Sequence, residues 1–390
     1  YGDHRDLHLS LRRQRQMCIR DSIQVVAPGK LTRAMMSIVR HPDGTIYLNT
    51  QTGPLYKSTD DGESWSPQPI DLPNVPPKQS IIGLGVTRGG RLLLVHQSPG
   101  HAPHDKRLYG QDLYVSYSDD GGQTWTQSQT DFRKFAPGIP NMKFHEDGTR
   151  TFVEQADGTL LFATTIVPAE DYKKAHPAAD PPGGPNFQYG GTANDRFGDV
   201  IFRSRDGGIT WGDRTCVYTS LNAHESALAI DPRNPNRILE IARIQHLVRP
   251  EEDALEMIRL TGNPQPYYKQ GALFESVDGG RNFRLAPGGF TDWYGHRGGL
   301  LWTPRNVLVL THNAGYRDSR VLARISLDGG RTWVNGSEDG TPLMTKSTKF
   351  TLAPEHSFIS PTIELRKPNH FLTVYCVGRG FEVRLSLIHI

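Results

Sequence analysis

The stretch SLDGGRTW at residues 326–333 decides the fold, because its pattern Ser-x-Asp-x-Gly-x-x-Trp returns along the chain. It occurs five times, at residues 58–65, 118–125, 204–211, 276–283 and 326–333, with Phe in place of Trp in the fourth copy. The Asp can accept hydrogen bonds from nearby backbone N–H groups, Gly tolerates positive φ, and the aromatic ring supplies an apolar anchor. Each copy therefore predicts a tight turn, which we call a clasp.

The residues ahead of the clasps alternate between apolar and polar, as in DLYVSYS at 112–118. This period of two is typical of a half-buried β-strand, so each clasp is expected to join two antiparallel strands. Successive clasps begin 50 to 86 residues apart, which indicates a unit of about fifty residues with insertions of different lengths. The sequence predicts an all-β fold, a six-bladed β-propeller with four-stranded antiparallel blades, whose last blade lacks a clasp.

The clasp resembles the Asp-box, or bacterial neuraminidase repeat, of the sialidase superfamily, and the resemblance covers residues 31–380. In that family the box lies on the outer rim, away from the active site, so the five clasp aspartates are expected to be structural. The resemblance implies an exo-glycosidase that hydrolyses a glycosidic bond of an acidic sugar, either sialic-acid-like or uronic. It also implies a secreted or periplasmic protein. No cofactor and no metal are expected from the sequence.

Length and composition fit one propeller domain over residues 23–384. Residues 1–22 are basic and unpatterned, without the apolar core of a secretory signal, and are expected to be a non-native or disordered leader; residues 385–390 are expected to be a non-native tail. The net charge of +3 is too small to indicate a nucleic-acid partner, and no segment is apolar enough to span a membrane. Three cysteines are too few for a disulfide framework.

Candidate site residues lie where the first strand of a blade begins or a second strand leads into a long loop, because those ends of a propeller face the central channel. Arginine, histidine and carboxylate side chains gather at these places. They are Arg33, His101, His104, Asp105, Glu225, Arg243, His246, His296, Arg297, His312, Arg317, Arg320 and His356.

The family comparison suggests roles for some of them. Sialidases hold the sugar carboxylate with three arginines, whose planar guanidinium groups match it bidentately. The segment HESAL at 224–228, followed by Arg243, resembles the Glu-Pro-Ser-Leu segment and second arginine of the family. The resemblance implies proton transfer by Asp105 and Glu225 and carboxylate binding by Arg243 and Arg320 or Arg317. Arg33 is the counterpart of the first arginine, although the Arg-Ile-Pro segment is absent; the histidines remain candidate substrate ligands.

One departure keeps other functions open. The family's nucleophilic Tyr is missing, because the corresponding segment reads HSFISP at 356–361. The sequence therefore does not support the retaining sialidase mechanism. The alternatives are a propeller polysaccharide lyase, in which His or Tyr removes a proton beside a uronate carboxylate, and a non-catalytic carbohydrate-binding propeller. All three functions predict an acidic oligosaccharide or glycoconjugate as the partner.

Overall fold

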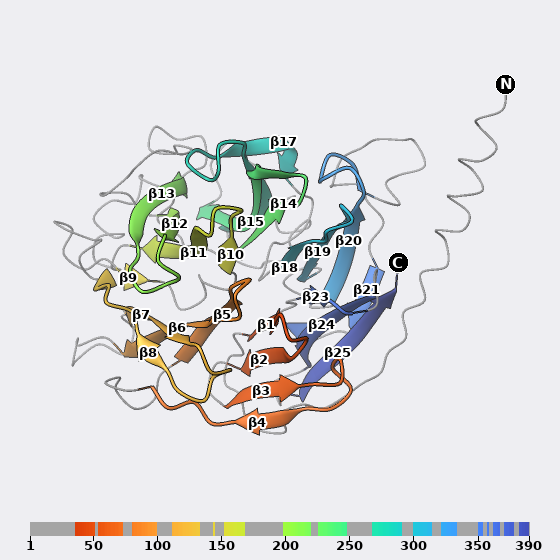
Figure 1. The fold of residues 1–390 in the computed structure, drawn as a ribbon. Helices are drawn as coiled ribbons and strands as arrows, with labels where there is room; N and C mark the ends of the chain where they lie inside the picture. The colour runs from red at the N-terminus through yellow and green to blue at the C-terminus, as the bar shows by residue number, and fades with distance from the viewer. Residues whose placement is uncertain are drawn as a thin grey trace.

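In a computed structural model of the protein, the described part of the chain is built from β-strands and their turns (Figure 1). The described residues are 36–50, 54–72, 80–99, 111–132, 143–144, 152–167, 198–219, 225–247, 267–290, 299–313, 321–333, 350–353, 357–358, 362–366, 370–377 and 382–389.

The strands follow one another as antiparallel units, which we call blades one to six. Blade one contains β1 (Met36–Arg40), β2 (Ile46–Thr50), β3 (Leu55–Ser58) and β4 (Ser66–Gln68). Blade two contains β5 (Ser80–Val86), β6 (Leu92–Pro99), β7 (Gln111–Ser118) and β8 (Thr126–Gln127). Blade three contains β10 (Phe152–Glu154), β11 (Leu160–Val167), β12 (Gly198–Ser204) and β13 (Gly212–Thr219).

The second half of the chain continues the plan. Blade four contains β14 (Ser226–Asp231), β15 (Asn234–Leu247), β16 (Tyr267–Ser276) and β17 (Arg284–Phe290). Blade five contains β18 (Gly299–Trp302), β19 (Leu308–Asn313), β20 (Val321–Ser326) and β21 (Phe350–Ala353). Blade six contains β22 (Ser357–Phe358), β23 (Thr362–Glu364), β24 (His370–Val377) and β25 (Glu382–His389), with β22 and β23 sharing one edge of β24.

The pairing gives five sheets, whereas the sequence predicts six blades. The difference arises at β9 (Lys143–Phe144), a short strand that pairs with both β7 and β11 and so joins blades two and three into one nine-stranded sheet. The inner strands β1, β5, β10, β14, β18 and β23 each contact the next, and β23 returns to β1. The architecture is therefore the predicted all-β propeller, with the sheets arranged around a common centre (Figure 1).

The clasps have one repeated geometry, seen well in blade two. The Ser118 hydroxyl donates to Asp120 Oδ1 at 2.7 Å and accepts from the Gly122 N–H at 2.8 Å. Asp120 also accepts from the Thr124 hydroxyl and backbone N–H, and these bonds lower the pKa of its carboxyl to about 2. Trp125 Nε1 donates to the Gly122 carbonyl at 3.1 Å. The clasp aspartates are structural turn formers, as the sequence predicts.

Each clasp packs on the blade that precedes it. The aromatic side chains of four clasps are 4% exposed and that of Trp65 is half-buried; the four are Trp125, Trp211, Phe283 and Trp333. At the ring closure, a Cβ added to Gly62, whose φ is +95°, would lie 2.9 Å from Leu372 Cδ2 of blade six. Met36 and Ile38 of blade one pack in the same cluster as Leu372. Apolar contact between blades six and one thus closes the ring.

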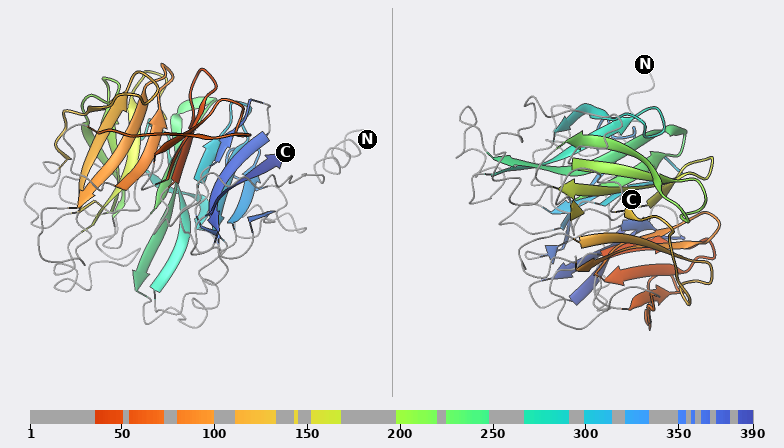
Figure 2. Two further views of the ribbon diagram at one scale, coloured as in Figure 1. Left: turned by 90° about the horizontal axis from the view of Figure 1, so that it is seen from below. Right: turned by 90° about the vertical axis from the view of Figure 1, so that its left-hand side faces the viewer.

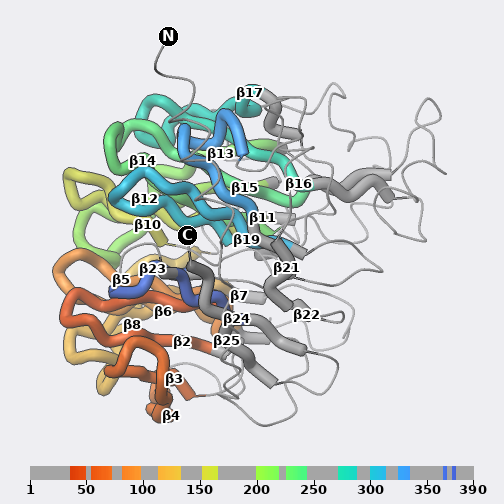
Figure 3. Tube along the Cα trace, turned by 90° about the vertical axis from the view of Figure 1, so that its right-hand side faces the viewer, coloured from red at the N-terminus to blue at the C-terminus, as the bar shows by residue number. Residues whose placement is uncertain are grey.

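Because consecutive strands in a blade are antiparallel, the ring has two different ends. One, the clasp end, carries the clasps and the turns that follow the inner strands; the coloured turns of Figures 2 and 3 gather on this side. The other, the mouth end, is where the inner strands begin. Within the described residues, no helix is long and apolar enough to cross a membrane.

Candidate functional site

A buried ion pair stands at the mouth end of blade four. Glu225 immediately precedes β14 and Arg243 lies in β15, where Ser226 is paired with Ala242. This register places the two residues opposite each other: Arg243 N donates to the Glu225 carbonyl at 3.1 Å, and Arg243 Nε lies 2.9 Å from Glu225 Oε2. The Glu225 side chain is fully buried and that of Arg243 is 8% exposed. The short turn at residues 231–234 fixes the register, since Asp231 Oδ1 accepts from the Arg233 N–H at 2.9 Å.

Arg243 retains unused donors. Its Nε lies against Glu225, and its Nη groups make no ion pair with the described part of the chain. The backbone of Arg243 is also held from blade three, because the Tyr218 hydroxyl donates to its carbonyl oxygen at 3.1 Å. Tyr218 is itself stacked on Phe274, with ring centroids 5.0 Å apart. The guanidinium is thus fixed in place and presents a charged edge, the arrangement needed to bind an anion bidentately.

A second polar pair lies in blade five. Arg324 Nε donates to His312 Nε2 at 3.0 Å, and both side chains are fully buried. An N–H donor on Arg324 requires an unprotonated Nε2, so His312 accepts through this nitrogen. That nitrogen therefore does not serve as an unengaged base. His312 was a candidate from the sequence and Arg324 was not; the signal for Arg324 was an arginine inside the otherwise apolar strand VLARIS.

A third polar group lies between blades three and four, where Asp199 of β12 and Glu240 of β15 are fully buried. Burial raises the pKa of Asp199 to about 7, and burial together with the neighbouring Asp199 raises that of Glu240. Neither residue was named from the sequence. A carboxylate within the apolar run ILEIA at 238–242 was the available signal for Glu240.

The structure brings two of the named residues together, Glu225 and Arg243, and buries His312 one blade away. His246 lies near the end of β15. The other named residues lie outside the described part of the chain: Arg33, His101, His104, Asp105, His296, Arg297, Arg317, Arg320 and His356. Their roles stay predictions.

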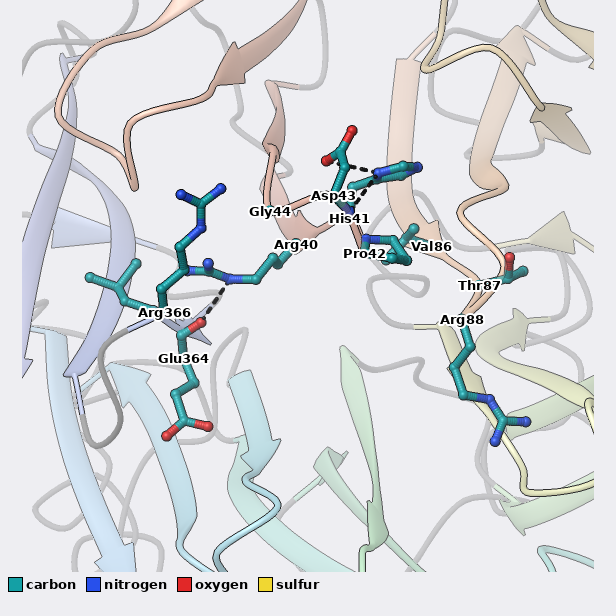
Figure 4. Close-up of a pocket in the computed structure, with 11 residues that line it drawn as sticks. Arg40, His41, Pro42, Asp43, Gly44, Val86, Thr87, Arg88, Glu364 and Arg366 are labelled. Atoms are coloured by element: carbon teal, nitrogen blue, oxygen red, sulfur yellow. Dashed lines mark hydrogen bonds and ion pairs between the residues drawn. The ribbon is translucent and has the colours of Figure 1, made fainter.

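A cavity of about 600 Å³ opens at the clasp end, between the turns of blades one, two and six (Figure 4). Three of its side chains lie against neighbouring carboxylates. Arg40 pairs with Asp61 at 2.7 Å, Arg88 with Glu154 at 3.2 Å, and His41 with Asp43 at 2.9 Å. This internal pairing is typical of turns that hold blades together, so the mouth end remains the candidate site.

Comparisons with known proteins support the fold. The family model for the BNR/Asp-box repeat matches residues 116–127. No match to a curated protein was found from the sequence. Among solved structures, a Hadza microbial sialidase superposes with a TM-score of 0.60 at 15% identity, over 92% of this chain and 65% of its own. An alpha-L-arabinofuranosidase from Fusarium graminearum superposes with a TM-score of 0.58 at 13% identity, over 95% and 98% of the two chains.

A mutant of Trypanosoma rangeli sialidase displaying trans-sialidase activity gives a TM-score of 0.57 at 12% identity, over 96% of this chain and 59% of its own. The chain therefore spans less than two thirds of the length of both sialidases. Identities this low concern the fold alone. The chain carries the BNR/Asp-box repeat and has the β-propeller fold found in these sialidases and in this arabinofuranosidase.

Proposed function

We propose that this protein is a sialidase-like glycoside hydrolase, secreted or periplasmic, that cleaves a glycosidic bond of an acidic sugar. The observation that carries the proposal is the Glu225–Arg243 pair at the mouth end, in which Glu225 occupies the Nε edge of the guanidinium and leaves the Nη groups for a ligand. A sugar carboxylate matches those donors in charge and in shape. Glu225, held beside them, would lie close to the ring of a sugar bound in this way.

Hydrolysis requires a proton for the leaving oxygen and a nucleophile at the anomeric carbon. We assign the first task to Asp105, in the sequence ahead of β7, and assign Glu225 as the base that takes a proton from attacking water. Water attacks the anomeric carbon, the glycosidic C–O bond breaks, and the leaving oxygen takes the proton of Asp105. This division needs no nucleophilic Tyr, which the segment at 356–361 lacks.

Paired variants of blade four test the assignment. Glu225→Gln keeps the shape and removes the base, and loss of general acid–base catalysis lowers kcat by about 10²-fold or more. Its control is Glu275→Gln, because Glu275 makes a comparable ion pair with Arg237 at 2.7 Å, on the same blade but at the clasp end. The control should lose stability and keep its turnover. Substrates are a panel of acidic oligosaccharides, with products read by mass spectrometry.

Arg243→Lys tests the anion contact. Lysine keeps the charge but loses the fork, so affinity for the acidic sugar should fall by roughly tenfold to a hundredfold, the equivalent of about 1.5–3 kcal/mol. Arg237→Lys is the matched control and should bind the sugar normally. Undiminished turnover of Glu225→Gln, or an unsaturated uronide seen by ultraviolet absorbance, would refute the hydrolase; binding without any turnover would indicate the carbohydrate-binding propeller instead.

A further inference from the structure

The seam between blades three and four contains two carboxyl groups that the proposed reaction does not use. Asp199 points from β12 toward blade four, on the same side as Ile201, which packs in the cluster between these blades. Glu240 points from β15 into the same seam, between Ile238 and Ala242 of that cluster. Both carboxyl groups are completely shielded from solvent. A buried carboxylate is costly unless it is paired or protonated.

The donors around the pair are few. Asp199 Oδ1 accepts from the Thr165 hydroxyl at 3.2 Å and from the Ser226 hydroxyl at 3.3 Å. The Glu240 carboxyl faces the same seam as Asp199, and Asp199 Oδ2 and both Glu240 oxygens receive no N–H or O–H donor from the described residues. Ser226 has a single hydroxyl proton, and Asp199 takes it. Two carboxyl groups this close need a proton between them.

No cation of the described part pairs with either carboxyl. Glu225, one residue before Ser226, adds negative potential at Asp199, while Arg243 is engaged with Glu225. Arg203, further along β12, donates to the Gly280 carbonyl of blade four and to Thr215. Across the strands, Asp199 is paired with Tyr218 and Glu240 with Phe274. A metal ion is a poor substitute for the proton, because the described residues contain no group of three or more ligating side chains.

We propose that protonated Glu240 donates a hydrogen bond to Asp199 and that this pair is a pH-sensitive latch between blades three and four, which positions Glu225 through Ser226. Successive residues of a strand point to opposite faces, so anchoring the Ser226 hydroxyl in the seam fixes the backbone that carries Glu225 at the mouth. The latch stands on its own contacts; only its effect on Glu225 rests on the proposed function.

The sign of the pH dependence follows from the protons held in each state. In the unfolded chain both carboxyls ionise near pH 4, whereas the folded pair keeps at least one proton to about pH 7 and above. The folded state thus binds more protons, and the contribution of the pair to stability falls as pH rises. Each retained proton reduces the folding equilibrium constant about tenfold per pH unit within this window. At alkaline pH the two ionised carboxylates repel and the seam loosens.

Unfolding of the full chain by denaturant between about pH 5 and about pH 9 tests the latch. In Glu240→Gln, an amide N–H replaces the shared proton. The folding equilibrium constant of the wild type should therefore fall more steeply with pH than that of the variant, and the difference between the two slopes should be about tenfold per pH unit. Glu275→Gln is the control and should retain the wild-type slope. Equal slopes in Glu240→Gln and the wild type would overturn the proposal. So would stabilisation of the wild type alone by added Ca²⁺ at alkaline pH, because it would show a cation site.

Two further readouts keep the inference separate from the proposed function. The infrared C=O stretch of a protonated carboxyl should be present in the folded wild type at pH 7 and lost in Glu240→Gln; its absence from the wild type overturns the latch even if the variant does not fold. If the protein hydrolyses an acidic sugar, Glu240→Gln should also shift the alkaline limb of the kcat profile, and an unshifted limb would remove the positioning role. A protein without hydrolase activity can still show the infrared band and the stability slope.

Discussion

Blade four contains two Arg–Glu pairs, one partly buried and one buried, that the protein uses differently. At the clasp end Arg237 uses all three nitrogens: Nε donates to Glu275, Nη1 to Asp231 and Nη2 to the Gly329 carbonyl of blade five. At the mouth end, Arg243 directs Nε at Glu225, and its Nη groups make no ion pair with the described part of the chain. The same residue types therefore tie blades together where every donor is used, and offer a binding edge where donors remain.

The contrast extends around the ring. Clasps repeat one set of bonds in five blades, whereas the polar groups toward the mouth end differ from blade to blade. The repeated clasp bonds indicate a role in the fold. The polar groups that differ between otherwise equivalent blades mark where a ligand can be recognised. The following predictions test whether the clasp end contributes stability alone.

The largest effect is expected from Trp211→Ala. Trp211 is 4% exposed and its ring centroid lies 4.8 Å from that of Phe162, so its removal leaves a cavity and should lower the free energy of unfolding by about 3–5 kcal/mol. The half-buried Trp65 occupies the same clasp position, and Trp65→Ala should cost clearly less. Denaturant unfolding measures both. Loss of turnover in the folded fraction of Trp211→Ala would show that the clasp end contributes to catalysis as well as to stability.

An intermediate effect is expected from Gly208→Ala. Gly208 has φ +91°, and a Cβ there would lie 2.7 Å from Leu93 Cδ2, which is fully buried in blade two and cannot easily move away. Gly158 has φ +87° with nothing within 4 Å, so Gly158→Ala isolates the backbone cost of about 1–2 kcal/mol. Crowding against Leu93 should add about 1–3 kcal/mol for Gly208→Ala. If thermal denaturation shows equal losses of stability in Gly208→Ala and Gly158→Ala, the packing of the clasp against the neighbouring blade contributes no stability.

The smallest effect is expected from Asp61→Gly. Asp61 has φ +63°, at a clasp position where the other four copies have Gly, and its carboxylate pairs with Arg40 at 2.7 Å in a partly exposed site. Glycine adopts this positive φ without strain, and the stability gained in this way should offset the loss of an ion pair worth about 0–1 kcal/mol. Melting temperature should therefore hardly change. A large fall would show that closure of the ring depends on this carboxylate.

The fold was readable from the sequence because its information is local. Spacing within each clasp sets the turn, and alternation sets the strands, so Ser118, Asp120 and Trp125 each have the role that their pattern predicts. The bridging strand β9 was not predicted, because two residues carry no periodic signal. Cys216 is free and buried, which agrees with the expectation that three cysteines form no disulfide framework.

The candidate site was only partly readable. Glu225 and Arg243 were found because HESAL at 224–228, followed by Arg243, resembles a family segment, and their ion pair follows from the β14–β15 register. Asp199 and Glu240 are 41 positions apart in sequence, and they meet only because two blades pack face to face. No local pattern encodes that meeting. A charged residue inside an apolar strand shows that some partner must exist but does not name it.

The contacts of the clasps also give the ring an order of assembly. The carbonyl of the first clasp glycine accepts a side-chain donor from the preceding blade: Gln68 donates to Gly121, Arg91 to Gly207, Gln155 to Gly279 and Arg237 to Gly329. During synthesis on the ribosome, each of these clasps therefore emerges after the blade that completes it. The clasp of blade one alone must wait for a later partner, since it packs on Leu372. Translation thus delivers the blades in the sequence in which they can dock, and the seam between blades six and one is the last to form.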